Sequence, residues 1–212
     1  MSEKRLKSAL VSVYSKEGLD PVIRSLDAQG VTIYSTGGTF KYLEDMGVPV
    51  RSVESLTSYP SILDGRVKTL HPKVFGGILA RREEAHLQQL EQYDIPEIDL
   101  VIVDLYPFEE TLAATTDEST IIEKIDIGGI SLIRAAAKNF RDVLVVASRD
   151  RYEALLELLE SKKGSSSLAE RKHYAAHAFQ VSSHYDAKIF GYFHDTDELA
   201  VEVGLKVSEE NF

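Results

Sequence analysis

The chain contains no cysteine among its 212 residues, which excludes disulfide bonds and thiolate metal ligands. It also lacks any apolar run near the roughly 20 residues that a membrane-spanning helix requires. Its polar first residues, MSEKRLK, have neither the apolar segment nor the cleavage site of a secretory signal. We therefore expect a cytoplasmic protein that does not enter membranes.

Positive charge is scarce as well. Lysine and arginine number 24 against 34 aspartates and glutamates, which gives a formal net charge of -10. Such a chain does not offer nucleic acid the basic face that it requires. The composition, 43% hydrophobic and 27% charged, is that of an ordinary globular protein, and the length suits one α/β domain with a helical extension.

A local cluster of basic residues lies in residues 65–77, GRVKTLHPKVFGG. This segment holds four basic side chains, Arg66, Lys68, His71 and Lys73. Its glycines and its proline disfavour a continuous helix, and an extended backbone over 66–70 would place Arg66 and Lys68 on one side. The cluster is suited to binding an anion; a solvated basic loop that balances acidic neighbours is the alternative.

Short β-rich runs alternate with helical periodicity along the chain. Strands are expected at 8–14, 31–36, 48–53, 100–106 and 143–148. Helices are expected through 22–26 with an end at Gly30, and near 40–46, 83–93, 119–124, 130–138, 150–159 and 168–193. This alternation predicts a doubly wound, mostly parallel sheet, with run 100–106 in its middle because it is the most apolar. The helices from about residue 150 form an extension, residues 164–167 a flexible capping segment, and residues 196–212 an acidic, loose tail.

A glycine-rich turn, Thr36–Gly37–Gly38–Thr39, lies where the second strand leads into a helix. Free backbone N–H groups at such a helix start bind phosphate, although a plain tight βα turn explains the glycines nearly as well. Ser12 and Lys16 follow the first strand. Because the carboxyl ends of parallel strands share one edge of the sheet, these residues are expected near the same site.

Further candidates follow the fourth strand. Tyr106 can relay a proton or simply pack, and Asp126 can act as an acid or base or simply cap the next helix. A straight helix from Asp126 to Lys138 would separate the two Cα atoms by roughly 18 Å. Joint action therefore requires converging side chains or a bend at Gly128–Gly129.

Two other site types have weak support. His173 and His177 lie one helical turn apart, but no HExxH motif or third ligand accompanies them, so no metal site is expected. The G-x-S-x-G elbow of a serine hydrolase is also missing.

Five segments carry a family resemblance: STGGT at 35–39, GRVKTLHPKVFGGILARR at 65–82, LYPF at 105–108, IDIGG at 125–129 and LIRAAAKN at 132–139. Together they resemble the IMP cyclohydrolase half of the bifunctional purine-biosynthesis family that also carries AICAR transformylase. The resemblance implies a methylglyoxal-synthase-like domain over residues 1–195, with additional C-terminal helices and a homodimeric assembly. The transformylase half is missing from the sequence, so no folate-dependent activity is expected.

The resemblance also implies a reaction, the last step of de novo purine synthesis. 5-Formamidoimidazole-4-carboxamide ribonucleotide (FAICAR) closes its ring to IMP with loss of water, by a cyclic amidine hydrolase run in the synthetic direction and without a cofactor. Two alternatives remain. One is a non-catalytic module that senses a phosphate or nucleotide on the same fold, and the other is a methylglyoxal synthase.

Site roles are likewise implied by the resemblance. The catalytic set is Lys68, Tyr106, Asp126 and Lys138; the substrate-binding set is Ser12, Lys16, Thr36, Gly38, Thr39, Arg66, Thr69 and Gly128. Lys68 would stabilise the oxyanion, Asp126 would accept or orient the carboxamide proton, and Tyr106 with Lys138 would relay a proton to the departing water. Asp104 stands where the family commonly has asparagine, and an ionised carboxylate only accepts hydrogen bonds.

Overall fold

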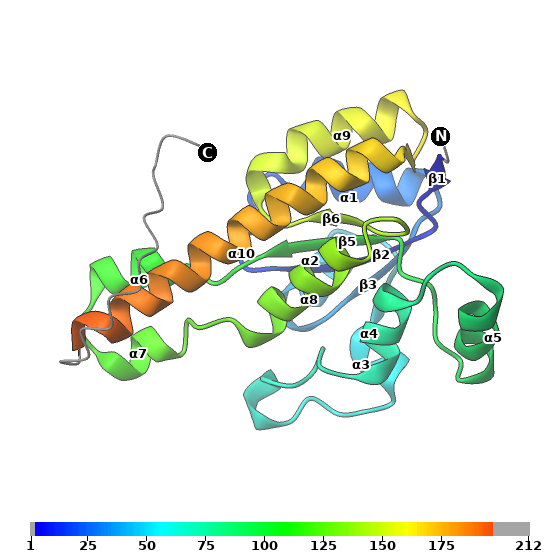
Figure 1. Cartoon of the computed structure of the whole chain (residues 1–212). Helices are drawn as coiled ribbons and strands as arrows, with labels where there is room; N and C mark the ends of the chain where they lie inside the picture. Colours follow the sequence, from blue (N-terminus) through cyan, green and yellow to red (C-terminus); the bar gives the residue numbers. More distant parts are fainter. Residues whose placement is uncertain (1–2, 197–212) are drawn as a thin grey trace.

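A five-stranded parallel sheet forms the centre of the molecule (Figure 1). The structure is a computed structural model that describes residues 3–196. The strands lie in the order β4-β3-β2-β5-β6. They are β2 (Ser8–Val13), β3 (Thr32–Ser35), β4 (Val50–Ser52), β5 (Leu100–Asp104) and β6 (Leu144–Val146). The predicted doubly wound sheet is confirmed, except that β2 rather than β5 is central.

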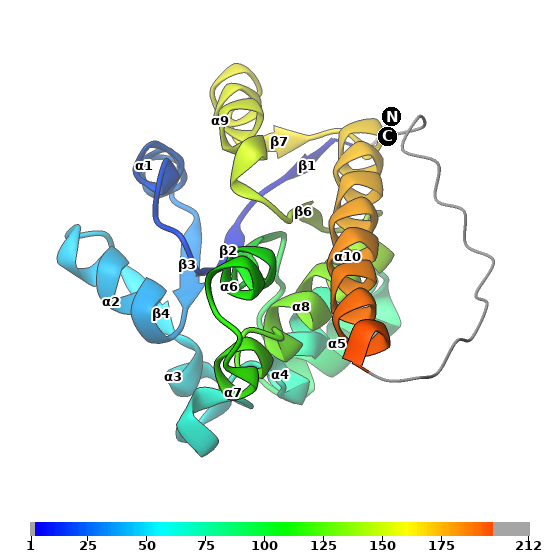
Figure 2. The same ribbon diagram turned by 90° about the vertical axis from the view of Figure 1, so that its left-hand side faces the viewer.

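Helices cover both faces of the sheet (Figure 2). One face carries α1 (Leu19–Ala28), α2 (Gly37–Asp45) and α9 (Tyr152–Ser161); the other carries α3 (Val53–Thr57), α4 (Pro72–Leu79) and α8 (Ile127–Lys138). Successive side chains along each strand point to opposite faces of the sheet, so each strand contributes to both hydrophobic cores. Val11 and Ile102 point into the first core, and Leu10 and Val101 into the second.

Shorter elements complete the fold. They are the helices α5 (Glu84–Gln92), α6 (Phe108–Ala114) and α7 (Glu118–Ile122), the 3-10 turns at Leu63–Gly65 and Arg149–Arg151, and the strands β1 (Lys4–Arg5) and β7 (Ser165–Ser166). β1 and β7 pair antiparallel, so the segment predicted to be flexible contains a paired strand. Its capping role is confirmed, because Ser167 and Glu170 exchange backbone N–H to side-chain hydrogen bonds of 2.8 and 3.3 Å.

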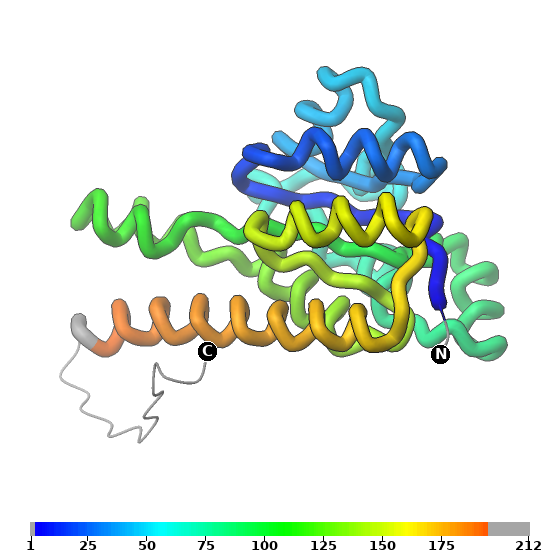
Figure 3. Tube along the Cα trace, turned by 90° about the horizontal axis from the view of Figure 1, so that it is seen from above, coloured from blue at the N-terminus to red at the C-terminus, as the bar shows by residue number. Residues whose placement is uncertain are grey.

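The long helix α10 (Leu168–Thr196) runs beside β6 and extends past the sheet towards α6 (Figure 3). Near its start the fully buried Arg171 donates hydrogen bonds to the carbonyls of Phe140, Arg141 and Ser166. Within residues 3–196, no helix combines the length and apolar character needed to cross a bilayer. All but the first residue of the predicted tail, 196–212, lies outside the described residues.

Two local predictions around the glycines were wrong. Residues 66–69 form turns rather than an extended segment, because Leu63, Asp64 and Gly65 all have positive φ and begin a compact turn. Pro72 then starts α4, since proline suits the first helical position, so residues 65–77 do not form one continuous helix. Likewise, α8 begins at Ile127 rather than at the expected residue 130, and it runs through its two glycines.

Gly77 in α4 provides a test of how closely this helix packs against the segment around Pro96. A Cβ at this position would clash with the backbone carbonyl of Pro96. We expect Gly77→Ala to lower the free energy of unfolding by about 1–3 kcal/mol in urea titrations, because overpacking forces α4 to move. The control Gly191→Ala lies in open space on α10 and should raise it by about 0.5–1 kcal/mol. Equal effects would contradict this packing.

Candidate functional site

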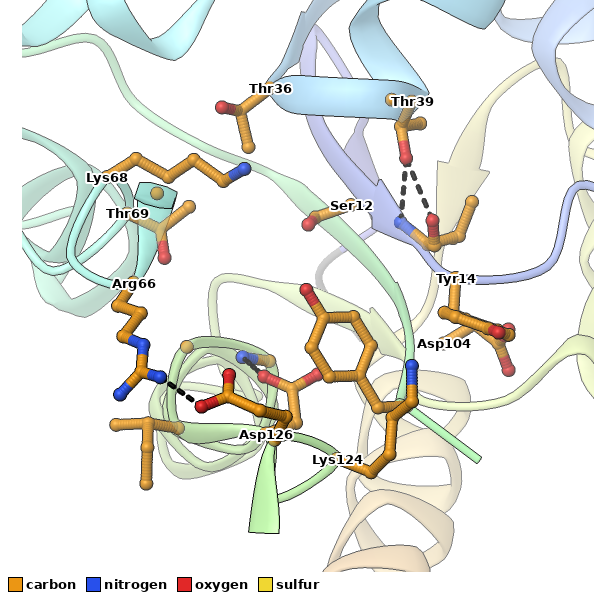
Figure 4. A pocket seen from close by; sticks show the side chains of 18 of the residues that line it. Ser12, Tyr14, Thr36, Thr39, Arg66, Lys68, Thr69, Asp104, Lys124 and Asp126 are labelled. Carbon is orange, nitrogen blue, oxygen red and sulfur yellow. Dashed lines mark hydrogen bonds and ion pairs between the residues drawn. The ribbon is translucent and has the colours of Figure 1, made fainter. Parts of the chain in front are cut away.

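A cleft with a volume of about 990 Å³ opens at the carboxyl ends of β2 and β5 (Figure 4). The strand order reverses here, because β2 is followed by β3 on one side and paired with β5 on the other. Val13 pairs with Asp104 at this edge. Such reversal points are where open parallel sheets bind ligands, and the volume is at the upper end of typical small-molecule sites.

Nearly all of the predicted site residues line this cleft. They are Ser12, Lys16, Thr36, Gly38, Thr39, Arg66, Lys68, Thr69, Tyr106, Asp126 and Gly128. They come from the β2–α1 turn, the start of α2, the loop before α4, the end of β5 and the start of α8. Segments far apart in the sequence therefore meet at one site, as the parallel topology predicts.

One end of the cleft is suited to an anion. The cap residue of α2, Thr36, makes no side-chain capping hydrogen bond, so the first N–H groups of this helix are available. A Cβ on Gly37 would lie 2.7 Å from Nζ of Lys68, which places the ammonium directly beside the helix start. Among residues 3–196, Lys68 has no carboxylate or other hydrogen-bond partner for this ammonium. The positive end of the α2 helix dipole and the Lys68 ammonium thus lie side by side in the cleft.

The two threonines of the glycine-rich turn use their hydroxyls internally. Thr36 donates to Oε1 of Glu54 at 2.9 Å. Thr39 donates to the Val13 carbonyl at 2.9 Å and accepts from the Val13 N–H at 3.1 Å. The Thr39 side chain therefore ties α2 to β2, and the Thr36 side chain ties it to α3. What this turn offers an anion is its backbone N–H groups.

Lys16 and Asp104 hold the turn after β2. The Lys16 ammonium donates to the carbonyls of Val13 and Tyr14, both at 2.8 Å, and burial lowers the pKa of Lys16 against the opposing charge of Asp104. Asp104 accepts from the Ser15 N–H at 2.8 Å, and burial raises its pKa, with that hydrogen bond opposing. The carboxyl that replaces the expected asparagine therefore acts as an acceptor here.

Arg66 spans the mouth of the cleft. Its guanidinium forms an ion pair with Glu123, which follows α7, and both side chains are more than half exposed. An exposed pair of this kind contributes only about 0.2–1 kcal/mol. Arg66 can therefore exchange Glu123 for a more negative ligand at little cost.

Asp126 and Tyr106 lie at the opposite end. Oδ1 of Asp126 accepts from the Gly129 N–H at 2.6 Å, so the capping role is confirmed. Burial raises the pKa of Asp126, opposed first by that hydrogen bond. Burial, followed by the charge of Asp126, also raises the pKa of Tyr106. Near neutral pH, Tyr106 is therefore a neutral phenol that can donate a proton. Oγ1 of Thr69 sits over the same helix start, 3.0 Å from where a Cβ on Gly128 would lie.

Lys124 was missed in the sequence. Its Nζ lies 5.5 Å from the ring centroid of Tyr14 and 5.7 Å from that of Tyr106, and the two rings meet edge to face at 5.6 Å. Cation–π contacts hold the ammonium in the cleft. The available signal was its place two residues before Asp126, but the residue was assigned to the end of a helix.

Lys138 is the one predicted site residue that the structure does not bring to this cleft. It is exposed at the last position of α8, and the helix between it and Asp126 is continuous. The axial separation of roughly 18 Å, at about 1.5 Å per residue, therefore persists. Within this chain Lys138 does not meet Tyr106 or Asp126.

His173 and His177 were considered as metal ligands. The described residues contain no group of three or more histidine, cysteine, aspartate or glutamate side chains that could hold a metal ion.

Family models match two consecutive parts of the chain. The model of the MGS-like domain matches residues 18–131, which include most of the cleft. The model of the AICARFT/IMPCHase bienzyme matches residues 136–211, which include α9 and α10.

Individual relatives agree with these models. The bifunctional purine biosynthesis protein PurH of Bacteroides thetaiotaomicron is 63% identical over 91% of this chain and 38% of its own length. PurH of Corynebacterium glutamicum is 47% identical over 94% of this chain and 38% of its own length. The crystal structure of ForH superposes with a TM-score of 0.77 at 35% identity, covering 89% of this chain and 99% of its own. The chain thus spans about 38% of the curated relatives that it matches.

The anion end of the cleft can be tested with ribose 5-phosphate and Lys68→Met. We expect the Kd, measured by calorimetry, to rise about tenfold or more, because a charge-assisted hydrogen bond contributes about 1.5–3 kcal/mol. The control is Lys41→Met, which removes an exposed ammonium on α2 that pairs with Asp45 and should leave the Kd unchanged. Equal Kd values for both variants and the wild type would place the phosphate elsewhere.

Proposed function

Because this chain belongs to the MGS-like domain family and matches purine-biosynthesis PurH proteins along most of its length, we propose that it is an IMP cyclohydrolase. It would close the ring of FAICAR to IMP with loss of water. The observation that carries the proposal is one cleft in which Lys68, without an ion-pair or hydrogen-bond partner among residues 3–196, lies at the start of α2, while the half-buried Asp126 lies with Tyr106 at the other end. The first end suits a phosphate and the second suits proton transfer.

Substrate binding starts at the phosphate. The N–H groups of Gly38 and Thr39 at the start of α2 and the ammonium of Lys68 are proposed to hold it, with Arg66 exchanging Glu123 for the ligand. Fixing the phosphate at one end directs the base towards Asp126. An intramolecular reaction requires this above all, since the two reacting arms must stay in a near-attack pose.

The ring closes when the carboxamide nitrogen attacks the formyl carbon. Asp126 is proposed to accept the proton that this nitrogen loses, and Tyr106, as a neutral phenol, to donate to the former formyl oxygen. A second proton passes from the formamido nitrogen to this oxygen, the bond from carbon to oxygen breaks, and the oxygen leaves as water. The proton that Asp126 accepted then passes to the Tyr106 phenolate, which restores both groups. The ring closure involves no oxidation or reduction.

Positive charge near the developing oxyanion is the remaining requirement. Lys124 lies beside Tyr106 and is proposed for this role. The role predicted for Lys68 at the formyl oxygen requires its side chain to turn from Gly37 towards Asp126. Its place beside α2 favours the phosphate.

A non-catalytic nucleotide-sensing domain is the second candidate. It is favoured by the position of Lys138, which leaves the catalytic set incomplete within one chain. Such a domain would bind IMP without converting FAICAR. Methylglyoxal synthesis stays an alternative for the same fold, and homodimer formation and a cytoplasmic location stay predictions.

The direct test is to add FAICAR to the purified chain without cofactor and follow the absorbance of IMP. We expect turnover in the wild type and a loss of at least about 100-fold in kcat for Asp126→Asn, because asparagine still caps α8 but accepts no proton. Asp117→Asn is the matched control, since Asp117 caps α7 in the same way. Nucleotide binding without turnover would favour the sensing domain.

The pH dependence offers an independent check. The general base must be ionised, and burial raises the pKa of Asp126. The acid limb of kcat/KM should therefore lie above the ordinary aspartate value of about 3.9, with activity lost as the pH falls through it. A kcat/KM that stays constant down to about pH 4 would contradict this role.

A further inference from the structure

The hydroxyl of Tyr185 joins α10 to the segment that carries Asp126. It accepts a hydrogen bond from the Asp126 N–H at 2.9 Å and donates one to the Lys124 carbonyl at 2.5 Å. We infer that Tyr185 is a positioning residue for the proposed ring closure, holding residues 124–126 so that the Asp126 carboxyl and the Lys124 ammonium face the cleft. This inference rests on the proposed function.

Both hydrogen bonds are partly buried, and the phenol itself is buried. Tyr185 is only 8% exposed, in a small apolar cluster with Phe108 and Ile121. Burial comes first among the causes that raise the pKa of Tyr185 to about 12. The phenol therefore stays neutral and can donate and accept at once. Without this hydroxyl the Asp126 N–H loses its acceptor and the Lys124 carbonyl loses this donor, so the segment is held less firmly.

The same cluster also holds the other proposed proton-transfer residue. The ring of Phe108 packs edge to face on Tyr185, with centroids 6.2 Å apart. The Phe108 N–H donates to the Tyr106 carbonyl at 2.9 Å. Through Tyr185, α10 thus contacts both the segment of Asp126 and the first residue of α6, two residues after Tyr106, and Figure 1 shows the end of α10 near α6.

Tyr185 and most of the cleft belong to different parts of the chain. The MGS-like domain model ends at residue 131, and Tyr185 falls within the bienzyme match over 136–211. The cleft therefore belongs mainly to the first region, while the hydroxyl that holds its acid–base segment comes from the second. In this proposal α10 packs against the domain and also holds residues 124–126 in position.

Tyr185→Phe tests the inference, because it removes the hydroxyl and keeps the ring. We expect kcat for FAICAR to fall about tenfold or more, since sub-ångström misplacement near reacting groups is costly, while KM changes by less than about twofold because the phosphate end is untouched. Amide exchange of residues 124–126 should become faster. The matched control is Tyr174→Phe on the same helix, where the phenol is 6% exposed and its buried hydroxyl has no partner among the described residues.

Unchanged kcat, unchanged amide exchange, or an equal loss for Tyr174→Phe would overturn the positioning role. A parallel rise in KM and fall in Tm would instead indicate a general structural role and overturn it as well. A wild-type chain that does not convert FAICAR would overturn the proposed function, and faster exchange in Tyr185→Phe would then still support the hold on residues 124–126.

Discussion

Parallel pairing of β2 with β5 is the constraint on which the site depends. It aligns Val13 with Asp104 at the carboxyl edge of the sheet. The strand order therefore reverses between the turn that follows β2 and the turn that follows β5. Every lining segment reaches the cleft because its strand or helix ends or begins at this edge. The backbone topology thus gathers the chemistry before any side chain is considered.

Electrostatics then divides the cleft into two ends. The chain carries a formal net charge of -10, yet at one end Lys68, which has no ion-pair partner among the described residues, lies beside the start of α2. At the other end Lys124 is held over the rings of Tyr14 and Tyr106, and burial raises the pKa of Asp126 and Tyr106. Local concentration of cations in an acidic molecule directs an anionic ligand to one place. The proposed ring closure uses both ends at once.

Sequence reasoning found most of the fold and most of the lining residues, since alternating strands and helices predict which turns share an edge. It failed where tertiary contacts decide. The positive φ values at Leu63 and Asp64 set the turn of residues 66–69, and no local pattern requires them. Continuity of α8 separates Lys138 from the cleft. Tyr185 is invisible to local patterns, because its hydrogen-bond partners lie about 60 residues earlier.

The most direct test of this account is a crystal structure of the chain with IMP bound. The account predicts the phosphate within hydrogen-bond distance of the Gly38 and Thr39 N–H groups and the Lys68 ammonium, with the six-membered ring of the base between Asp126 and Tyr106. A nucleotide bound with its phosphate at the start of α8, or outside the cleft, would contradict it.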